Sequence, residues 1–271
     1  MKIVVCADKN VEAGLHVTLF SLMDHCQCEV QIYLIQDGLH KNEIDRLHTT
    51  LNCFQGRYKL TIIEQGSSDF NKFSDLAGNH YPYAKLLISN LVQEDKVLYI
   101  DCDTIIFKDL EPLYNSDLEG HVISAMVECD YTGSSDFELF DSLGMETDAS
   151  YFNSGVMLMD LNRWRNERIS EQCFDFANKH PNDLKTADQT TMNYVFYKNN
   201  FKVLDNSFNR LIYAWDTYKA GMERDNVIHL LGIPKPWIIE AYPIPTRNRL
   251  FMSVLRKTAM RSVEPFSQCY S

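Results

Sequence analysis

The order of apolar segments at the start of the chain constrains its fold more than any other feature. Residues 2–7 and 30–35 are short apolar runs, rich in β-branched residues, and each leads into polar residues. Such runs are typical of buried strands. Between them, leucines recur at helical spacing and predict a helix over residues 12–25. These leucines are Leu15, Leu19 and Leu22.

A second helix and a third strand continue this alternation. Residues 60–63 form the next short apolar run. Apolar positions at helical spacing precede it, namely Ile44, Leu47, Leu51 and Phe54. Strand, helix, strand, helix, strand is the pattern of a parallel sheet covered by helices. The sequence therefore predicts an α/β fold in which ligands bind beyond the carboxyl ends of the strands.

The same criteria divide the rest of the chain into elements. Strands are predicted at residues 96–100, 122–127, 156–161 and 227–230, and helices at residues 81–92, 163–179 and 187–197. Residues 129–150 are rich in Asp, Ser and Gly, and we expect them to form a mobile loop over a cleft.

Charge and cysteine usage limit the partners and the compartment. A net charge of −11 argues against a nucleic-acid partner, because a phosphate backbone repels an acidic surface. A diphosphate can still bind if a divalent cation screens it. The eight cysteines include no CxxC pair, which favours a reducing compartment. With no apolar stretch as long as a membrane span or a signal peptide, we expect a cytoplasmic protein.

The composition changes after residue 246. Residues 247–263 contain no acidic residue, and their basic side chains are Arg247, Arg249, Arg256, Lys257 and Arg261. Apolar residues interleave with them at helical spacing, as in amphipathic segments that bind anionic membranes. The alternative is a helix packed on the domain. We predict one domain over residues 1–246 and a basic segment over residues 247–271, which can attach the protein to the inner face of the cell membrane.

The strongest local signal follows the strand predicted at residues 96–100. Asp101 and Asp103 come directly after it, and residues two apart in an extended chain point the same way. Two ionised carboxylates so close repel each other, and a divalent cation relieves that repulsion while attracting a phosphate. The alternative is an acidic turn that caps the next element.

A second signal follows the strand predicted at residues 227–230. Histidine beside carboxylates shifts preference from Mg²⁺ toward Mn²⁺, so His229 is a candidate ligand. Gly232 permits close approach of the backbone to a ligand, and Lys235 offers a charge for a phosphate. We assign Trp237 to packing. The alternative is a strand that leads into a proline turn.

Other polar residues lie at predicted element boundaries. Asp8 and Asn10 follow the first strand, where they can hydrogen-bond a nucleotide or form a turn. Asn153 and Ser154 precede an apolar strand and can present polar groups to a ligand. Asp188 opens a helix, and capping that helix is its alternative role.

In their order along the chain these segments resemble glycosyltransferase family 8, which includes bacterial lipooligosaccharide galactosyltransferases and their glycogenin relatives. The resemblance covers roughly residues 1–240. Its segments are Ala7-Asp8-Lys9-Asn10, Tyr83-Ala84-Lys85-Leu86, Asp101-Cys102-Asp103, Phe152-Asn153-Ser154-Gly155-Val156, Asp188-Gln189 and residues 229–237.

The resemblance implies a GT-A fold, a Rossmann-like, mostly parallel mixed sheet with helices on both faces. It also implies a UDP-galactose or UDP-glucose donor and retention of anomeric configuration. Asp101, Asp103 and His229 would bind Mn²⁺, with Mg²⁺ as the alternative. The implied donor-binding residues are Ala7, Asp8, Asn10, Lys85, Asp101, Cys102, Asp103, Asn153, Ser154, Asp188, Gln189, Gly232 and Lys235. Many relatives carry Arg where Lys85 stands and Ala where Ser154 stands.

For catalysis, the resemblance places Gln189 nearest the back face of the anomeric carbon. An amide is a poor nucleophile, so we expect front-side attack by the acceptor hydroxyl, with Asp188 orienting the sugar hydroxyls. The acceptor is expected to be a saccharide, a lipid-linked glycan or a protein-linked glycan.

Two other functions compete with this interpretation. One is a phosphatase of the haloacid-dehalogenase type, whose motif usually has Thr or Val where Ile105 stands. The other is a protein that binds UDP-sugars without catalysis.

Overall fold

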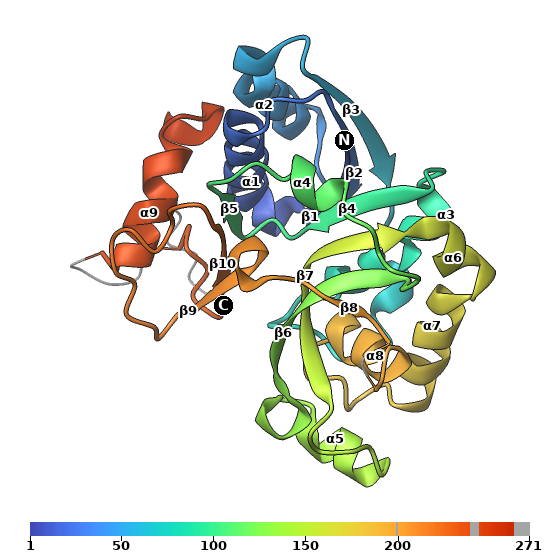
Figure 1. Ribbon diagram of the computed structural model, residues 1–271. Coiled ribbons are helices and arrows are strands. Elements are labelled where there is room, and N and C mark those ends of the chain that lie inside the picture. The colour runs from blue at the N-terminus through green and yellow to red at the C-terminus, as the bar shows by residue number, and fades with distance from the viewer. Residues whose placement is uncertain (199, 239–243, 263–271) are drawn as a thin grey trace.

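Seven strands form the central sheet of the computed structural model, which describes residues 1–198, 200–238 and 244–262 (Figure 1). The strand order is β3-β2-β1-β4-β7-β6-β8. The first four strands are parallel, β7 is antiparallel to both of its neighbours, and β8 is parallel to β6. The strands are β1 (Lys2–Asp8), β2 (Val30–Asp37), β3 (Tyr58–Glu64), β4 (Lys96–Ile100), β6 (Ile123–Asp130), β7 (Ser150–Asp160) and β8 (Lys202–Val203). The predicted mixed, mostly parallel α/β sheet is confirmed.

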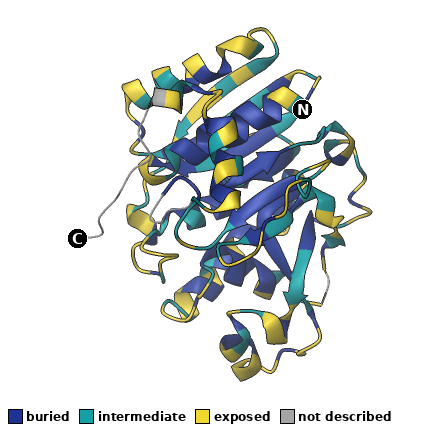
Figure 2. Ribbon diagram, turned by 90° about the vertical axis from the view of Figure 1, so that its left-hand side faces the viewer, coloured by how far each residue is buried: buried dark blue, intermediate teal, exposed yellow. Residues whose placement is uncertain are grey.

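Helices cover both faces of this sheet, because its central strands are apolar on both sides. In β1, Ile3 and Val5 belong to one hydrophobic cluster, and Val4 belongs to the cluster on the opposite face. The central strands and the inner sides of the helices are accordingly buried (Figure 2). One helical layer holds α1 (Glu12–His25) and α2 (Lys41–Leu51). The other holds α3 (Ile88–Leu91), α6 (Leu161–Asn166), α7 (Ile169–Lys179) and α8 (Asp188–Val195).

A second, smaller sheet joins the end of β4 to strands much later in the chain. Its order is β5 (Thr104–Ile106), β10 (Val227–Leu231) and β9 (Arg210–Tyr213). Strand β10 is antiparallel to β5 and parallel to β9. A third hydrophobic cluster packs this sheet against α1 and α9 (Thr246–Leu255), and it contains Trp237 and Phe251, whose ring centroids lie 5.6 Å apart. The assignment of Trp237 to packing is confirmed.

Differences from the predicted elements occur where local backbone chemistry overrides periodicity. Residues Tyr81–Leu87 form a 3-10 helix with Pro82 at its start, and only the short α3 follows. The helix predicted at residues 163–179 is divided into α6 and α7, because Arg168 between them is left-handed (φ 55°). Strands β5, β8 and β9 contain two to four residues, too few to show alternation.

The expectation of a mobile loop over residues 129–150 is wrong. Strand β6 continues to Asp130, and helix α5 (Phe137–Ser142) follows. Tyr131, Asp136 and Phe140 are each about 1% exposed, so this segment packs against the domain. The segment is polar in composition, but the few apolar residues that it has are spaced so that they reach the core.

The C-terminal basic segment begins with a helix that packs on the domain. The apolar side of α9 joins the cluster shared with α1, and Arg247 is only 3% exposed. The Arg247 guanidinium donates to the carbonyls of Leu231 (2.9 Å) and Pro234. The boundary predicted at residue 246 therefore follows a change in composition, and the independence of residues 247–271 stays a prediction. Residues 263–271 lie outside the described range.

Among the residues that the structure describes, no helix has the length and apolar character needed to cross a membrane.

Candidate functional site

The two aspartates after β4 lie in a turn and not in the extended segment that we expected. Backbone hydrogen bonds hold both ends of this turn. The Asp101 N–H donates to the Gly155 carbonyl of β7 (2.7 Å), and the Leu230 N–H of β10 donates to the Asp103 carbonyl (2.9 Å). The Thr104 hydroxyl also donates to the Asp101 carbonyl (2.9 Å). The chain therefore turns between β4 and β5 with both carboxylates directed to one place.

His229 meets the two carboxylates across the small sheet. It pairs with Thr104 in the register of β10 and β5. Its Nε2 lies 2.9 Å from an Asp103 oxygen and 3.8 Å from an Asp101 oxygen. One ligand atom from each of the three residues lies within 4.8 Å of the others. Two carboxylates and an imidazole in this geometry could hold a divalent cation.

Lys235 supplies a second positive partner for this cluster. Its Nζ lies 2.6 Å from the Asp103 oxygen that does not face His229. Burial alone would raise the pKa of Asp103, but the charge of Lys235 and the contacts with His229 hold that pKa well below its usual range. Asp103 is therefore ionised whenever the protein is folded near neutral pH.

Lys85 is not the solvated charge that its position on a helix suggests. The side chain is 3% exposed, and its Nζ lies 2.8 Å from Asp188 and 3.4 Å from Asp101. It also donates to the Ser154 hydroxyl (2.9 Å) and lies 4.6 Å from the centroid of the Tyr99 ring. Burial lowers the pKa of Lys85, but the two carboxylates outweigh burial and raise it above its usual value. One buried ammonium thus joins the aspartate turn to the start of α8.

Gly155 allows β7 to pass directly beneath the cluster. A Cβ at this position would lie 2.1 Å from Cε1 and 2.6 Å from Nδ1 of His229, and 2.9 Å from an Asp101 oxygen. These distances are far shorter than van der Waals contact, so only glycine fits here. The predicted motif at residues 152–156 therefore contributes a glycine that leaves room for His229 and Asp101, as well as polar groups.

Hydrogen bonds behind His229 orient its imidazole ring and place a proton on Nδ1. The Gly155 N–H donates to Asn153 Oδ1 (3.0 Å), and Asn153 Nδ2 donates to Glu128 (3.0 Å), so the amide of Asn153 has one orientation. Asn209 must then give its Nδ2 to Asn153 Oδ1 (2.9 Å) and turn its Oδ1 to His229 Nδ1 (3.0 Å). His229 Nδ1 is the donor in that contact, so Nε2 is the ring nitrogen that faces the aspartates and could bind a cation.

Glu128 and Asn209 are site residues that sequence reasoning missed. Glu128 lies in an irregular stretch of β6, where Val127 pairs with Phe152 and Cys129 with Tyr151, so Glu128 has no partner in the register. Such a bulge redirects a side chain. The Glu128 carboxylate accepts from Gln189 Nε2 (3.2 Å) as well as from Asn153. No short motif marks either residue, because both depend on the pairing of distant strands.

Gln189 is held on two sides at the start of α8. Its Oε1 accepts from the Ser154 N–H (2.9 Å), and its Nε2 donates to Glu128. Asp188 beside it also accepts from the Ser154 hydroxyl (3.1 Å), in addition to its ion pair with Lys85. Burial raises the pKa of Asp188, and Lys85 opposes that effect. The structure thus brings Lys85, Ser154, Asp188 and Gln189 together as predicted.

The residues predicted after β1 form their own hydrogen-bonded loop. The Asp8 carboxylate accepts from the backbone and side-chain N–H groups of Asn10 (both 2.9 Å) and from Asn79 (3.0 Å), a residue that sequence reasoning missed. Ala7 and Cys102 are buried, and the Cys102 thiol contacts the Cys6 carbonyl (3.3 Å). The carboxyl end of β1 therefore adjoins the aspartate turn.

Gly232 follows β10 with a positive φ of 83°. A Cβ there would lie 3.2 Å from the Ala214 Cβ. Glycine is required at this position by backbone conformation and by close contact.

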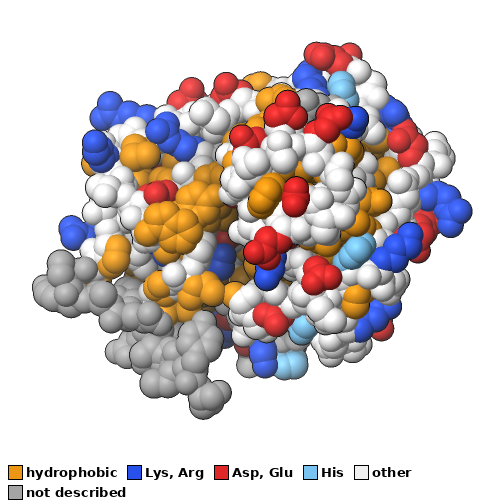
Figure 3. All heavy atoms as spheres, turned by 90° about the horizontal axis from the view of Figure 1, so that it is seen from below, with side chains coloured by type: hydrophobic (Ala, Val, Ile, Leu, Met, Phe, Trp, Pro, Cys, Tyr) orange, Lys and Arg blue, Asp and Glu red, His pale blue; other side chains and the backbone are white. Residues whose placement is uncertain are grey.

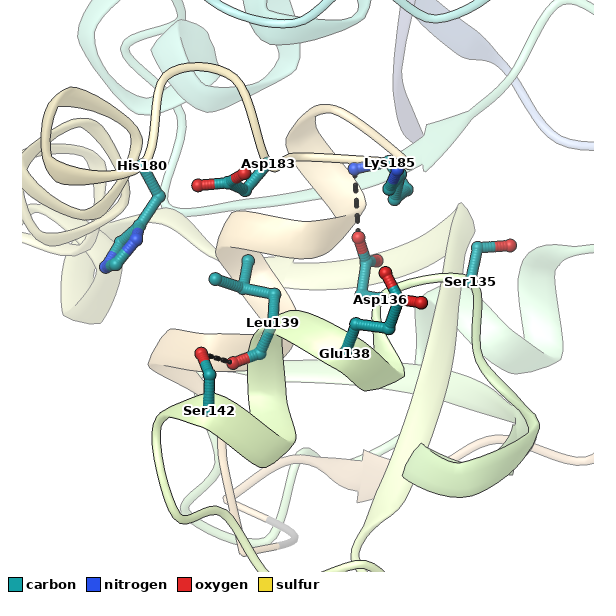
Figure 4. A pocket seen from close by; sticks show the side chains of 8 residues that line it. All are labelled: Ser135, Asp136, Glu138, Leu139, Ser142, His180, Asp183 and Lys185. Atoms are coloured by element: carbon teal, nitrogen blue, oxygen red, sulfur yellow. Dashed lines mark hydrogen bonds between the residues drawn. The ribbon is translucent and has the colours of Figure 1, made fainter.

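A separate cavity of about 260 Å³ lies beside α5 and contains none of the predicted site residues (Figure 4). Its buried carboxylate, Asp136, accepts from the Lys185 N–H (3.0 Å) and from the hydroxyls of Tyr151, Thr186 and Thr190 (2.7–2.9 Å). Asp136 thereby fixes the segment that leads into Asp188 and Gln189.

The fold is the GT-A fold of known glycosyltransferases. A crystal structure of galactosyltransferase LgtC with donor and acceptor sugar analogs matches with a TM-score of 0.78 and 23% sequence identity. The match covers 95% of this chain and 96% of that one. At that identity the likeness establishes the fold.

Sequence comparison gives the family. The model of glycosyl transferase family 8 matches residues 2–240, and the chain belongs to that family. General stress protein A of Bacillus subtilis (strain 168) is 26% identical over 261 residues, covering 88% of this chain and 87% of the relative. The lipopolysaccharide 1,2-glucosyltransferase of Escherichia coli is 27% identical over 251 residues, covering 85% of this chain and 71% of the relative.

Proposed function

We propose that this glycosyltransferase moves a hexose from UDP-galactose or UDP-glucose to a hydroxyl of a glycan or glycolipid, with retention of configuration and dependence on Mn²⁺. The observation that carries the proposal is the convergence of Asp101, Asp103 and His229 with Lys235 beside them. The ligand set of two carboxylates and one imidazole suits Mn²⁺, with Mg²⁺ as the alternative. When bound, the cation supplies positive charge for the leaving diphosphate.

The protein's own residues would bind and orient the donor around this centre. Lys235 would pair with the diphosphate, and Gly232 would let the backbone approach it. Asp8 and Asn10, with Ala7 and Cys102 beneath them, would face the nucleoside. Lys85, Asn153, Ser154, Asp188 and Gln189 would surround the hexose.

Retention by front-side attack is supported by how Asp188 and Gln189 are held. Asp188 is 2% exposed, and one of its carboxylate oxygens, Oδ2, is held by Lys85 (2.8 Å) and by the Ser154 hydroxyl (3.1 Å). Gln189 is an amide and a poor nucleophile. We infer that Asp188 orients sugar hydroxyls and that the acceptor hydroxyl attacks from the side of the departing UDP. A glycosyl adduct on Asp188 detected by mass spectrometry would contradict this mechanism.

The test of function is a screen of UDP-sugars with the full chain, following UDP release. We expect turnover with UDP-galactose or UDP-glucose in Mn²⁺, loss of turnover after chelation, and recovery when Mn²⁺ is restored. If no UDP-sugar releases UDP faster than its uncatalysed rate, the proposal is wrong. Binding of the donor without any release would instead indicate a non-catalytic UDP-sugar-binding protein.

A substitution at Asn209 tests the hydrogen bond that orients His229. We expect Asn209→Leu to weaken Mn²⁺ affinity by about 10- to 100-fold, because loss of a hydrogen bond behind a ligating histidine typically has that effect. Free Mn²⁺ measured by electron paramagnetic resonance during a titration gives the affinity. The control is Asn206→Leu at an exposed position nearby. Wild-type affinity in Asn209→Leu would show that this asparagine does not set the tautomer.

We also propose that exposed basic residues after residue 246 attach the protein to anionic membrane. Four of the five are exposed, namely Arg249, Arg256, Lys257 and Arg261. Each basic residue near such a surface is worth about 1 kcal/mol. Changing the four to Gln leaves Arg247 and the packing of α9 intact. We expect this variant to lose co-sedimentation with phosphatidylglycerol vesicles, and unchanged sedimentation would remove the idea.

A further inference from the structure

Trp215 is a large aromatic side chain that is exposed and yet held in place. It is 76% exposed, the highest fraction among the described large hydrophobic residues. One face of its indole stacks on the Tyr213 ring, with centroids 4.8 Å apart and an interplanar angle of 16°. The backbone is also fixed, because the Tyr213 N–H donates to the Asp216 carboxylate (2.7 Å). A single exposed aromatic residue is common on protein surfaces, so a function can be assigned to it only from its neighbours.

The ring beneath Trp215 connects it to the interior of the site. The Tyr213 hydroxyl donates to Glu128, and the same carboxylate accepts from Gln189 and Asn153. Tyr213 therefore lies between the exposed indole and the carboxylate that touches the residues proposed around the hexose. Since Glu128 is only partly buried, its carboxylate can also accept from a bound hydroxyl.

The loop that carries Lys235 adjoins the same aromatic pair. Tyr213 pairs with Leu231 in the register of β9 and β10. A Cβ on Gly232 would lie 3.8 Å from a carbon of the Trp215 ring. Trp215 thus borders the place where the diphosphate is proposed to bind. Figure 3 shows a face of the molecule on which hydrophobic side chains are gathered. Within residues 213–233, the exposed large hydrophobic residues are Trp215 and Ile233.

We propose that Trp215 is a stacking platform for the acceptor saccharide, and specifically for the sugar next to the one that receives the hexose. This inference rests on the proposed function. Glu128 would accept a hydroxyl of the reacting sugar, and Tyr213 contacts both that carboxylate and the indole. The neighbouring sugar would then place its apolar C–H face on the electron-rich face of Trp215. A rigid aromatic gives this contact at low entropic cost. The acceptor is therefore an oligosaccharide of at least two sugars.

Tryptophan fluorescence can observe this contact directly. Trp164 and Trp237 are 1% and 7% exposed, so iodide quenches mainly Trp215. The full chain with Mn²⁺ and UDP would be titrated with disaccharides built from glucose, galactose and N-acetylglucosamine, and with the matching methyl monosaccharides. We expect at least one disaccharide to protect Trp215 from iodide more strongly than its monosaccharide does. If no disaccharide in the panel gives protection, the platform is overturned.

Kinetics on the protecting disaccharide supplies an independent measurement. We expect Trp215→Ala to raise the acceptor KM by about tenfold while changing kcat much less, since an aromatic contact of this kind typically contributes that much affinity. Trp215→Phe should recover most of the loss. Val203→Ala, at an exposed apolar position in β8, is the matched control and should behave as wild type. A wild-type KM for Trp215→Ala would contradict the proposal.

Other occupants of the platform give different results. Protection of Trp215 by lipid vesicles without saccharide, or a change of oligomeric state in Trp215→Ala, would overturn the saccharide assignment. A failure of the proposed function can be told apart from a failure of the platform, because UDP release would then be absent with every donor. Normal UDP release with an unaffected acceptor KM removes only the platform.

Discussion

Gly155→Ala is expected to abolish Mn²⁺ binding and sugar transfer and to destabilise the fold. The new Cβ would lie 2.1 Å from His229 Cε1 and 2.9 Å from an Asp101 oxygen. Both neighbours are fixed, since His229 is bound from behind by Asn209 and the Asp101 N–H is bonded to Gly155 itself. Relief of the overlap must therefore separate the histidine from the aspartates.

The expected effects of Gly155→Ala on stability and on rate can be estimated separately. Overpacking of a buried position typically costs about 1–3 kcal/mol of stability. Loss of a cation that contributes about 4 kcal/mol to the transition state corresponds to about a thousandfold in rate. Urea denaturation, Mn²⁺ titration and UDP release measure the three consequences separately.

Gly66→Ala is the control for Gly155→Ala. Gly66 does not require a positive φ, and the nearest atom that its Cβ would meet is 4.0 Å away. We expect this variant to match wild type in all three measurements. A folded Gly155→Ala protein that binds Mn²⁺ with wild-type affinity would show that the cluster is not the metal centre.

Lys85→Met is expected to lower the free energy of unfolding by about 3–5 kcal/mol, the usual cost of leaving a buried charge without its partner. Methionine has nearly the volume of lysine, so the loss arises from charge and hydrogen bonds. Asp188 is 2% exposed and would keep only its contact with Ser154. The measurement is urea denaturation at pH 7.

Lys85→Arg is the matched control, because it retains the positive charge between Asp101 and Asp188. We expect the free energy of unfolding to fall less in Lys85→Arg than in Lys85→Met. If both variants lose the same stability, the size and shape of the lysine side chain matter more than its charge.

The pH dependence of the Lys85→Met effect has a definite sign. The folded-state pKa of Lys85 is raised above its ordinary value of 10.5, so its contribution is fully present below that pH and is lost only in more alkaline solution. The pKa of Asp188 is raised by burial and should rise further without Lys85. Protonation of Asp188 in acid removes the unpaired charge, so the difference between Lys85→Met and wild type should narrow as the pH falls.

The main frame of the fold could be predicted because periodicity is strong where strands and helices are long. The helix predicted at residues 12–25 and the strand at residues 96–100 have the bounds observed for α1 and β4. The aspartate pair and His229 were recognised as polar residues at strand ends, and they do converge. The extended geometry of Asp101 and Asp103 was wrong, because Thr104 and the backbone of β10 impose a turn.

The residues that sequence reasoning missed depend on tertiary pairing. Glu128 reaches the site because β6 is irregular opposite β7, and Asn209 reaches it because β9 lies beside β10. Trp215 follows a strand of only four residues, which shows no alternation. The burial of Lys85 could not be predicted either, since its two carboxylate partners come from β4 and α8, far away in the sequence.

The contact between Lys235 and Asp103 has a consequence for the order in which ligands bind. A dication that approaches Asp103 meets an ammonium 2.6 Å from the same carboxylate and is repelled by it. A diphosphate that draws Lys235 toward itself removes this competitor and frees a ligand oxygen. Metal and nucleotide should therefore bind with positive cooperativity, and thermodynamic reciprocity requires each to tighten the other by the same factor.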